Sequence, residues 1–316
     1  MFDYSKEFEL LAAAYSASGG NAQDLKNNQY GLMLISSNKM LGKNEIPGLI
    51  IEDEEISDGV KAKIIVKKNA VLKNPVHLCF GVIPEEGVQR IISDFILEEN
   101  SSAQFLAHCS FPKALNVQHI MEGTIKIGRN AHMEYNETHY HGPQGGIEVL
   151  PKMKIEVDEG GSYTSTFKLI KGAAGRIDMD YEAYLKNKAT AEMYAKIYGK
   201  SSDQIKVKES IYLNGNESRG LAKSRIVVSE KAHAKVLGEV VGNGEHSRGH
   251  IDCMEIIRGR NAVVEAVPRL KVVNETAKLT HEAAIGSVDK KQVETLMARG
   301  LGEQEAVDVI VMGLLK

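Results

Sequence analysis

The chain has 316 residues, of which 43% are hydrophobic and 26% are charged, a composition that allows a sizeable core and a soluble surface. The net charge of −3 provides no argument for binding nucleic acid or an anionic membrane, and no window holds the roughly 18 uninterrupted apolar residues of a membrane span. Because the first residues also lack the apolar run of a signal peptide, we expect a soluble, cytoplasmic protein.

The N-terminal segment shows the spacing of an amphipathic helix. Tyr4, Phe8, Leu11 and Tyr15 share one helical face, which predicts a helix over residues 3–16, followed by a polar loop. We interpret residues 1–45 as a helical cap, because the end coils of a stacked protein expose edges.

Residues 46–286 contain a repeat of short apolar runs and tight turns. The runs alternate in period two, as at Ile125 and Ile127, which places one face inward. A β-sandwich is the alternative, but it favours hairpin dipeptides, and only Asn214-Gly215 fits that signal. We therefore predict an all-β core built as a parallel β-helix. The small turn residues are Ala70, Ser102, Ala131, Gly161 and Ala189, spaced by 32, 29, 30 and 28, with Ala232 and Ala262 again 30 apart.

The last 30 residues, 287–316, predict two short helices. Ser287 can cap the first, in which Val293, Leu296 and Met297 share a face, and Gly300 ends it. The second begins at Glu303. The pair either caps the solenoid or docks another protein. The apolar stripe of the second helix consists of Val307, Ile310, Val311 and Leu314.

Three cysteines lie far apart, without a CxxC spacing. This argues against a disulfide framework and against a four-thiolate site in one chain. Cys79 is expected to be a small buried hydrophobe. Cys109 follows His108, whose imidazolium could lower the pKa of the thiol.

Cys253, His281 and Glu282 form the first candidate ligand set. They lie about one repeat apart, and residues one coil apart in a solenoid stack at about 4.8 Å, so the set could converge. Thiolate, imidazole and carboxylate together suit iron better than magnesium or calcium. Because His281 and Glu282 are adjacent, only one of the two is expected to face the site.

Histidines supply the second candidate. His139 and His141 are two apart, so a strand presents both imidazoles on one face, a workable spacing for metal binding. The alternative is a pair of solvated surface histidines. His132 falls on the opposite face, and His246 and His250 have the surroundings of loop residues.

Other catalytic motifs are missing from the sequence. There is no GxxxxGK[ST] loop, so ATP chemistry must come from a partner, and there is no GxSxG or HExxH motif.

With these residues in view, the chain resembles the SufB/SufD family of iron–sulfur assembly scaffolds over roughly residues 60–316. Cys253 is followed by Gly259, Pro268 and then His281-Glu282-Ala283, in the order of the family's B-type pattern. The resemblance implies a right-handed parallel β-helix and a transient iron–sulfur cluster. It implies that Cys253 and Glu282 act in cluster assembly, with His281 and Glu265 as further candidates.

The resemblance also implies a sulfur path and partners. The AHCSFP stretch is similar to the family's GC-x-A-P stretch, so Cys109 is expected to receive sulfur, with His139 and His141 lining its path through the β-helix. Residues 299–316 resemble the closing motif that binds the SufC ATPase, which implies docking of a SufC-like ATPase on the stripe from Val307 to Leu314. A sulfur donor and apo-protein acceptors are the other implied partners, and the chain itself is expected to be a non-catalytic scaffold that binds no nucleotide.

Several positions depart from the B-type pattern. Gly81 and Ile83 stand where B-type proteins have Arg and Asn, and Glu265 replaces a histidine. This mixed B and D character predicts a homodimer in place of the usual B–D pair.

Two other functions remain open. A carbohydrate-binding or carbohydrate-active β-helix is disfavoured by an aromatic content of 6% without tryptophan. A purely structural adaptor of the ATPase differs only in holding no iron.

Overall fold

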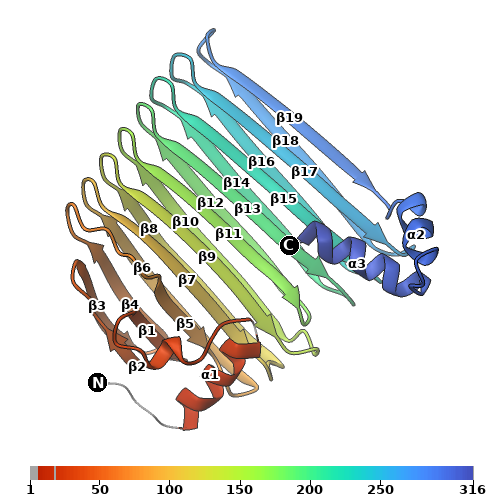
Figure 1. Ribbon diagram of the computed structural model, residues 1–316, viewed down its shortest axis with the longest axis horizontal. Coiled ribbons are helices and arrows are strands. Elements are labelled where there is room, and N and C mark those ends of the chain that lie inside the picture. Colours follow the sequence, from red (N-terminus) through yellow and green to blue (C-terminus); the bar gives the residue numbers. More distant parts are fainter. Residues whose placement is uncertain (1–5, 18, 316) are drawn as a thin grey trace.

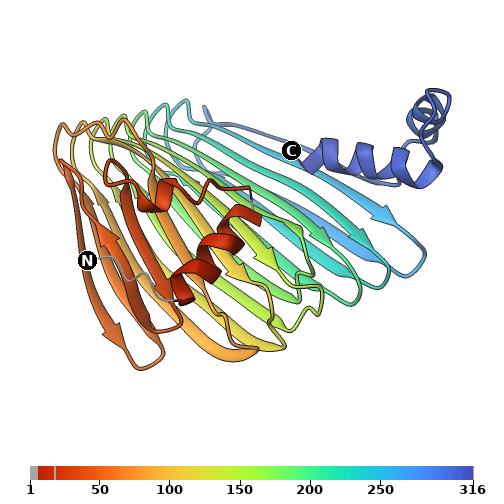
Figure 2. The same cartoon turned by 60° about the horizontal axis from the view of Figure 1, so that its bottom comes forward.

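Two long sheets stack into a parallel β-solenoid of about eight turns, with helices at both chain ends (Figure 1, Figure 2). The computed structural model describes residues 6–17 and 19–315. The chain passes alternately between the sheets, so odd-numbered strands from β5 onward lie in one and even-numbered strands from β4 onward in the other. This confirms the predicted solenoid.

The ten-stranded sheet is named sheet A and the nine-stranded sheet is named sheet B. Sheet A comprises β1 (Gly31–Ser36), β2 (Lys39–Asn44), β5 (Val76–Gly81), β7 (Ser102–Phe111), β9 (His132–His141), β11 (Ser162–Lys171), β13 (Thr190–Gly199), β15 (Arg219–Ser229), β17 (Arg248–Arg258) and β19 (Lys278–Gly286). Sheet B comprises β3 (Leu49–Ile56), β4 (Gly59–Val66), β6 (Glu86–Leu97), β8 (Asn116–Ile127), β10 (Ile147–Val157), β12 (Arg176–Leu185), β14 (Gln204–Leu213), β16 (His233–Gly242) and β18 (Val263–Val272). The helices are α1 (Lys6–Ala17), a 3₁₀ turn η1 (Asp24–Lys26), α2 (Lys290–Met297) and α3 (Glu303–Leu315).

The core fills the space between the sheets. Along each strand every second side chain points inward, and Ile125 and Ile127 of β8 are buried as the alternation predicts. Parallel, in-register pairing then stacks equivalent residues of successive coils into columns that run the length of the solenoid. Aromatic rings reinforce the packing, as where Phe95 meets Phe105 edge to face at 5.2 Å between centroids.

The corners leading from sheet B to sheet A, from the one after β4 to the one after β16, each turn through a residue with positive φ, followed by a small residue that is buried in all but the first. Asn69, Asn100 and Asn130 occupy the left-handed position, which asparagine tolerates. The Asn100 side-chain amide donates to the Asn69 side-chain oxygen at 3.0 Å, so neighbouring corners are tied together. The buried residue of the second corner is Ser101, so the prediction of Ser102 is wrong by one position. Ala232 and Ala262 belong to the opposite set of corners, between β15 and β16 and between β17 and β18.

Helix α1 lies against the outer face of sheet A and does not cover the end of the solenoid (Figure 2). Phe8 and Leu11 bury themselves in a cluster that includes Leu34 and Cys79, which is why the helix takes this position. Tyr4 lies outside the described residues. Strands β1 and β2 fall within residues 1–45, so that segment is only partly helical.

Helix α3 also covers the outer face of sheet A. Val311 and Leu315 of α3 pack against Ile170 and Val227. Helix α3 begins at Glu303, as predicted. The cap of α2 is Asp289, whose carboxylate accepts backbone N–H bonds from two residues of the first turn; the prediction of Ser287 is therefore wrong.

The two ends of the solenoid differ in chemistry. The N-terminal edge strand β3 carries Glu52 and Glu54, charges that oppose pairing with another sheet. At the other end the last coil stays uncovered, and its exposed apolar side chains are Val263, Val272, Val273 and Ile285.

Candidate functional site

Cys109 and Cys253 both point into the interior from sheet A. Cys109 belongs to a column that passes through His139 and reaches Glu255. Cys253 belongs to the adjacent column, which also holds Glu137 and Ser224. Five coils separate the two thiols, roughly 24 Å at about 4.8 Å per coil.

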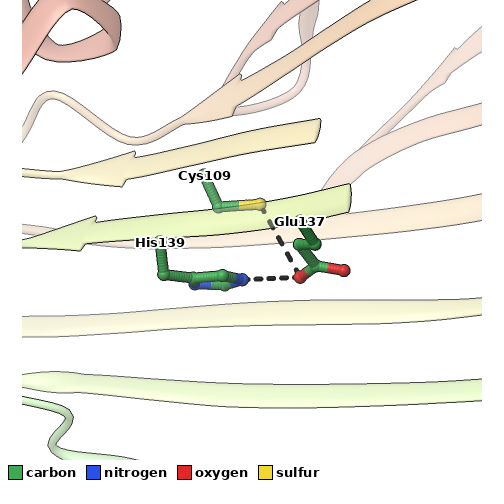
Figure 3. A group of neighbouring side chains, drawn as sticks. All are labelled: Cys109, Glu137 and His139. Atoms are coloured by element: carbon green, nitrogen blue, oxygen red, sulfur yellow. Dashed lines mark hydrogen bonds and ion pairs between the residues drawn. The ribbon is translucent and has the colours of Figure 1, made fainter. Parts of the chain in front are cut away.

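Cys109 sits in a buried cluster with Glu137 and His139 (Figure 3). Its Sγ lies 4.0 Å from Glu137 Oε1, and the same oxygen lies 2.5 Å from His139 Nε2. The Tyr181 hydroxyl donates to the other carboxylate oxygen at 3.4 Å. All three residues of the cluster are at most 2% exposed. Their ligand atoms lie within 4.8 Å of one another, so among the described residues this is a group that could hold a metal ion.

A chain of hydrogen bonds fixes the tautomers of both histidines. His141 Nδ1 lies 2.9 Å from the Ala173 carbonyl, which can only accept, so this nitrogen carries a hydrogen. Burial lowers the pKa of His141 to about 3, so its Nε2 keeps a lone pair. His139 Nδ1, 3.2 Å away, must therefore donate to it. One proton then remains between His139 Nε2 and Glu137.

The environment of Cys109 contradicts one prediction. Burial, together with the charge of Glu137, raises the pKa of the thiol well above its ordinary value. His108 cannot lower it, because this imidazole lies on the outer face against the ring of Tyr15, and burial lowers its own pKa to about 4. Alternation on the strand turns the two neighbours to opposite faces.

The paired histidines His139 and His141 are interior residues, so the alternative of solvated surface side chains is wrong. His132 is exposed on the other face, as predicted. Two residues of this region escaped sequence reasoning. Glu137 lies two positions before His139, so the same period-two argument could have found it. His119 of β8 is fully buried with neither ring nitrogen paired, and its ring centroid lies 6.0 Å from that of His139.

Cys253 lies under the last coil beside other buried polar groups. Burial raises the pKa of its thiol to about 11, and nearby Glu255 adds to the shift while a bond with Ser224 opposes it. The Ser224 hydroxyl donates to Glu255 at 2.7 Å, and burial raises the pKa of this carboxyl to about 7. Glu209 lies deeper inside, where burial raises its pKa to about 8.

The register of β17 and β19 separates the predicted ligands. Cys253 pairs with Ala283, so His281 falls on the same inward face, two positions away. Glu282 pairs with Asp252, whose carboxylate bonds Arg225, and therefore lies on the outer face. Within one chain the structure thus brings Cys253 and His281 to one face and leaves Glu282 on the other.

Glu265 lies on β18 in sheet B. It forms an ion pair with Lys235 at 3.1 Å on the outer face of that sheet. It is therefore not part of the Cys253 surroundings in this chain.

The four residues of the predicted apolar stripe on α3 lie in different surroundings. Three of them line two hollows, and one is buried in the protein's own core. Val307 lines a groove of about 840 Å³ between α2 and α3. Ile310 and Leu314 line a second hollow, of about 420 Å³, beside Ile285. Val311 is fully buried against sheet A.

Comparison with known proteins decides the family. A family model described as SUF system FeS cluster assembly, SufBD core domain, matches residues 89–314. The chain belongs to the SufBD family. An iron–sulfur cluster assembly SufBD family protein of Methanocaldococcus jannaschii is 45% identical over 98% of both chains. A second one, from Pyrococcus horikoshii, is 37% identical over 99% of this chain and 95% of its own length.

The B-type branch of the SufBD family is a more distant match. The iron–sulfur cluster assembly protein SufB of Bacillus subtilis is 26% identical over 80% of this chain and 54% of its own length. Membership confirms the resemblance predicted from Cys253 and the His281-Glu282-Ala283 run, and it makes this chain an iron–sulfur cluster assembly protein of a scaffold-type family. Among the described residues, no helix is long and apolar enough to cross a bilayer.

Proposed function

We propose that this SufBD protein is a cytoplasmic, non-catalytic scaffold that receives sulfur at Cys109, assembles a transient iron–sulfur cluster at Cys253 and passes it to acceptor proteins. The supporting observation is that two buried thiols face one solenoid interior, Cys109 in its closed middle and Cys253 beneath its open end. In this proposal the iron–sulfur cluster is a product that the protein assembles and transfers, and not a resident cofactor.

Polar side chains between the two cysteines support an internal sulfur path. Tyr181 contacts Glu137 beside Cys109, and Glu209 is its register partner in the next coil of sheet B. Ser224 then precedes Cys253 in its column. Buried polar groups in a core require a reason, because an apolar core would avoid their desolvation cost. A polar sulfur species moving between the thiols provides such a reason.

Replacing Cys253 with alanine tests the proposal. Anaerobic reconstitution with ferrous iron and sulfide should give cluster absorbance in the wild type and none in Cys253→Ala, because the soft ligand is lost. Cys79→Ala is the matched control, since Cys79 is equally buried but lies under α1 on the outer face. Equal absorbance from the Cys253→Ala protein and the wild type would refute the assignment.

We further propose that a second copy joins the open coil. The edge strands β18 and β19 offer backbone groups and exposed apolar side chains, whereas the edge strand β3 at the opposite end carries Glu52 and Glu54. Glu282 lies on the edge strand β19, on the face opposite the Cys253 of its own chain. In the dimer it would therefore face the site of the partner subunit. Val307, Ile310 and Leu314 line the hollows proposed to dock a SufC-like ABC ATPase, which supplies the ATP chemistry this sequence lacks.

Val272→Asp should convert the dimer to a monomer in analytical ultracentrifugation, because it places a charge among the exposed apolar side chains of the open coil. Val71→Asp is the control, since Val71 is 66% exposed far from this end. A wild-type protein that sediments as a monomer, or a dimer that survives the Val272→Asp change, would contradict the proposed interface.

A further inference from the structure

The cluster around Cys109 has the donor set and the surroundings of a metal site. We propose that Cys109, Glu137 and His139 bind a single divalent transition-metal ion of the ferrous or zinc class inside the closed middle of the solenoid. This site is separate from Cys253, and the inference does not depend on where the iron–sulfur cluster assembles.

The distances fit an ion with small adjustments. Zinc-class ions lie about 2.3 Å from sulfur and about 2.0–2.2 Å from nitrogen and oxygen, so tetrahedral ligand atoms lie roughly 3.3–3.6 Å apart. Here Cys109 Sγ is 4.0 Å from Glu137 Oε1, and His139 Nε2 is 2.5 Å from the same oxygen. To bind the ion, the Cys109 Sγ moves closer to the Glu137 carboxylate by a few tenths of an ångström. The distance between His139 Nε2 and Glu137 Oε1 increases by about 1 Å.

The outer shell of the site is already built. A metal-binding histidine usually donates its other ring N–H to a fixed acceptor, which sets its tautomer. His139 does so through Nδ1 to His141, which in turn donates to the Ala173 carbonyl. The Glu137 carboxylate is held by the Tyr181 hydroxyl on its remaining oxygen. His139 Nε2 is therefore directed at the centre of the cluster.

Charge balance selects a divalent ion. One thiolate, one carboxylate and one neutral imidazole carry a charge of −2, so a divalent ion makes the buried site neutral, as a dry interior requires. The ion replaces two protons, the one on the Cys109 thiol and the one held between Glu137 and His139. Sulfur and nitrogen ligands disfavour magnesium and calcium.

A neighbouring imidazole provides an independent observation. His119 is fully buried, and neither of its ring nitrogens has a hydrogen-bond partner. Buried polar groups without partners are rare, and a bound ion close to the group is one explanation for them. Three protein ligands leave the fourth tetrahedral position open, and the nearby His119 has its ring centroid 6.0 Å from that of His139.

A surface cavity lies close to the outer shell of the site. A surface cavity of about 420 Å³, lined by Pro143, Gly145 and Asp203, is also lined by Ala173. The carbonyl of Ala173 accepts the His141 bond, so one residue separates this cavity from the outer shell.

Cobalt(II) is the probe for the test. Metal-free, full-length protein titrated anaerobically with Co²⁺ should show thiolate-to-metal charge-transfer absorbance that saturates at one equivalent per chain. Cys253→Ala and Cys79→Ala should keep it, Cys109→Ser should lose it, and His141→Ala should weaken Co²⁺ binding about 10- to 100-fold by removing the outer shell. Charge transfer that persists in Cys109→Ser, or that disappears in Cys253→Ala, would overturn the proposal.

A second measurement avoids any change at the site. Cobalt-edge X-ray absorption of the Cys253→Ala protein should show one sulfur neighbour with nitrogen and oxygen making up the rest; a shell without sulfur would also overturn the proposal. Because cluster reconstitution reports on Cys253 and Co²⁺ binding reports on Cys109, either proposal can fail alone.

Discussion

His139→Leu is expected to destabilise the metal-free protein by about 3–5 kcal/mol, a cost typical of removing one partner of a buried ion pair. The Glu137 carboxylate is 1% exposed, and His139 is its closest partner, at 2.5 Å. Leucine would leave the carboxylate with the long Tyr181 bond, the Tyr135 hydroxyl and the Cys109 thiol. Urea denaturation with a chelator present measures the loss.

Two further variants make this prediction specific. The double variant Glu137→Leu/His139→Leu should recover most of the lost stability, because an apolar pair of similar volume replaces the charges. His132→Leu changes an exposed histidine on the same strand and should stay within about 0.5 kcal/mol of the wild type. A double variant as unstable as His139→Leu would show that packing, and not charge pairing, explains the effect.

Glu209→Gln is expected to stabilise the protein increasingly as the pH rises. Burial raises the pKa of Glu209 to about 8 from an ordinary 4.5, so the folded state keeps its proton after the unfolded state has lost it. Between pH 4.5 and 8 the unfolded state binds fewer protons, so this residue lowers stability as pH increases. Near and above pH 8 the effect levels off at a value on the order of 4 kcal/mol.

Urea denaturation midpoints of the wild type and Glu209→Gln between pH 5 and 9 test this. The gain from the amide should be small at pH 5 and largest at pH 8–9. Glu54→Gln, whose side chain is 70% exposed, should give no comparable trend. If the difference between the wild type and Glu209→Gln does not change with pH, Glu209 is not protonated in the folded state.

The amino-acid sequence alone determined the architecture. Every coil requires inward side chains at every second position, as at Ile125 and Ile127, and small residues at its corners. The sequence therefore shows the same pattern again after each step of about 30 residues. Cys253 was predicted from its set with His281 and Glu282, and Cys109 from the similarity of the AHCSFP stretch to the SufB/SufD family. The helix that begins at Glu303 was predicted from the apolar stripe in its own sequence.

The composition of the sites was decided by the tertiary structure. Alternation shows that Glu137, His139 and His141 share a face, but only the covering sheet B makes that face the interior and shifts the pKa of Cys109 upward. Strand register, which no local pattern contains, put His281 and not Glu282 on the face of Cys253. His119 comes from the other sheet, with its ring centroid 6.0 Å from that of His139, and helices α1 and α3 pack on the outer face of sheet A. These outcomes depend on pairing between segments distant in the chain, where burial and neighbouring charges, and not local propensity, set the free energy.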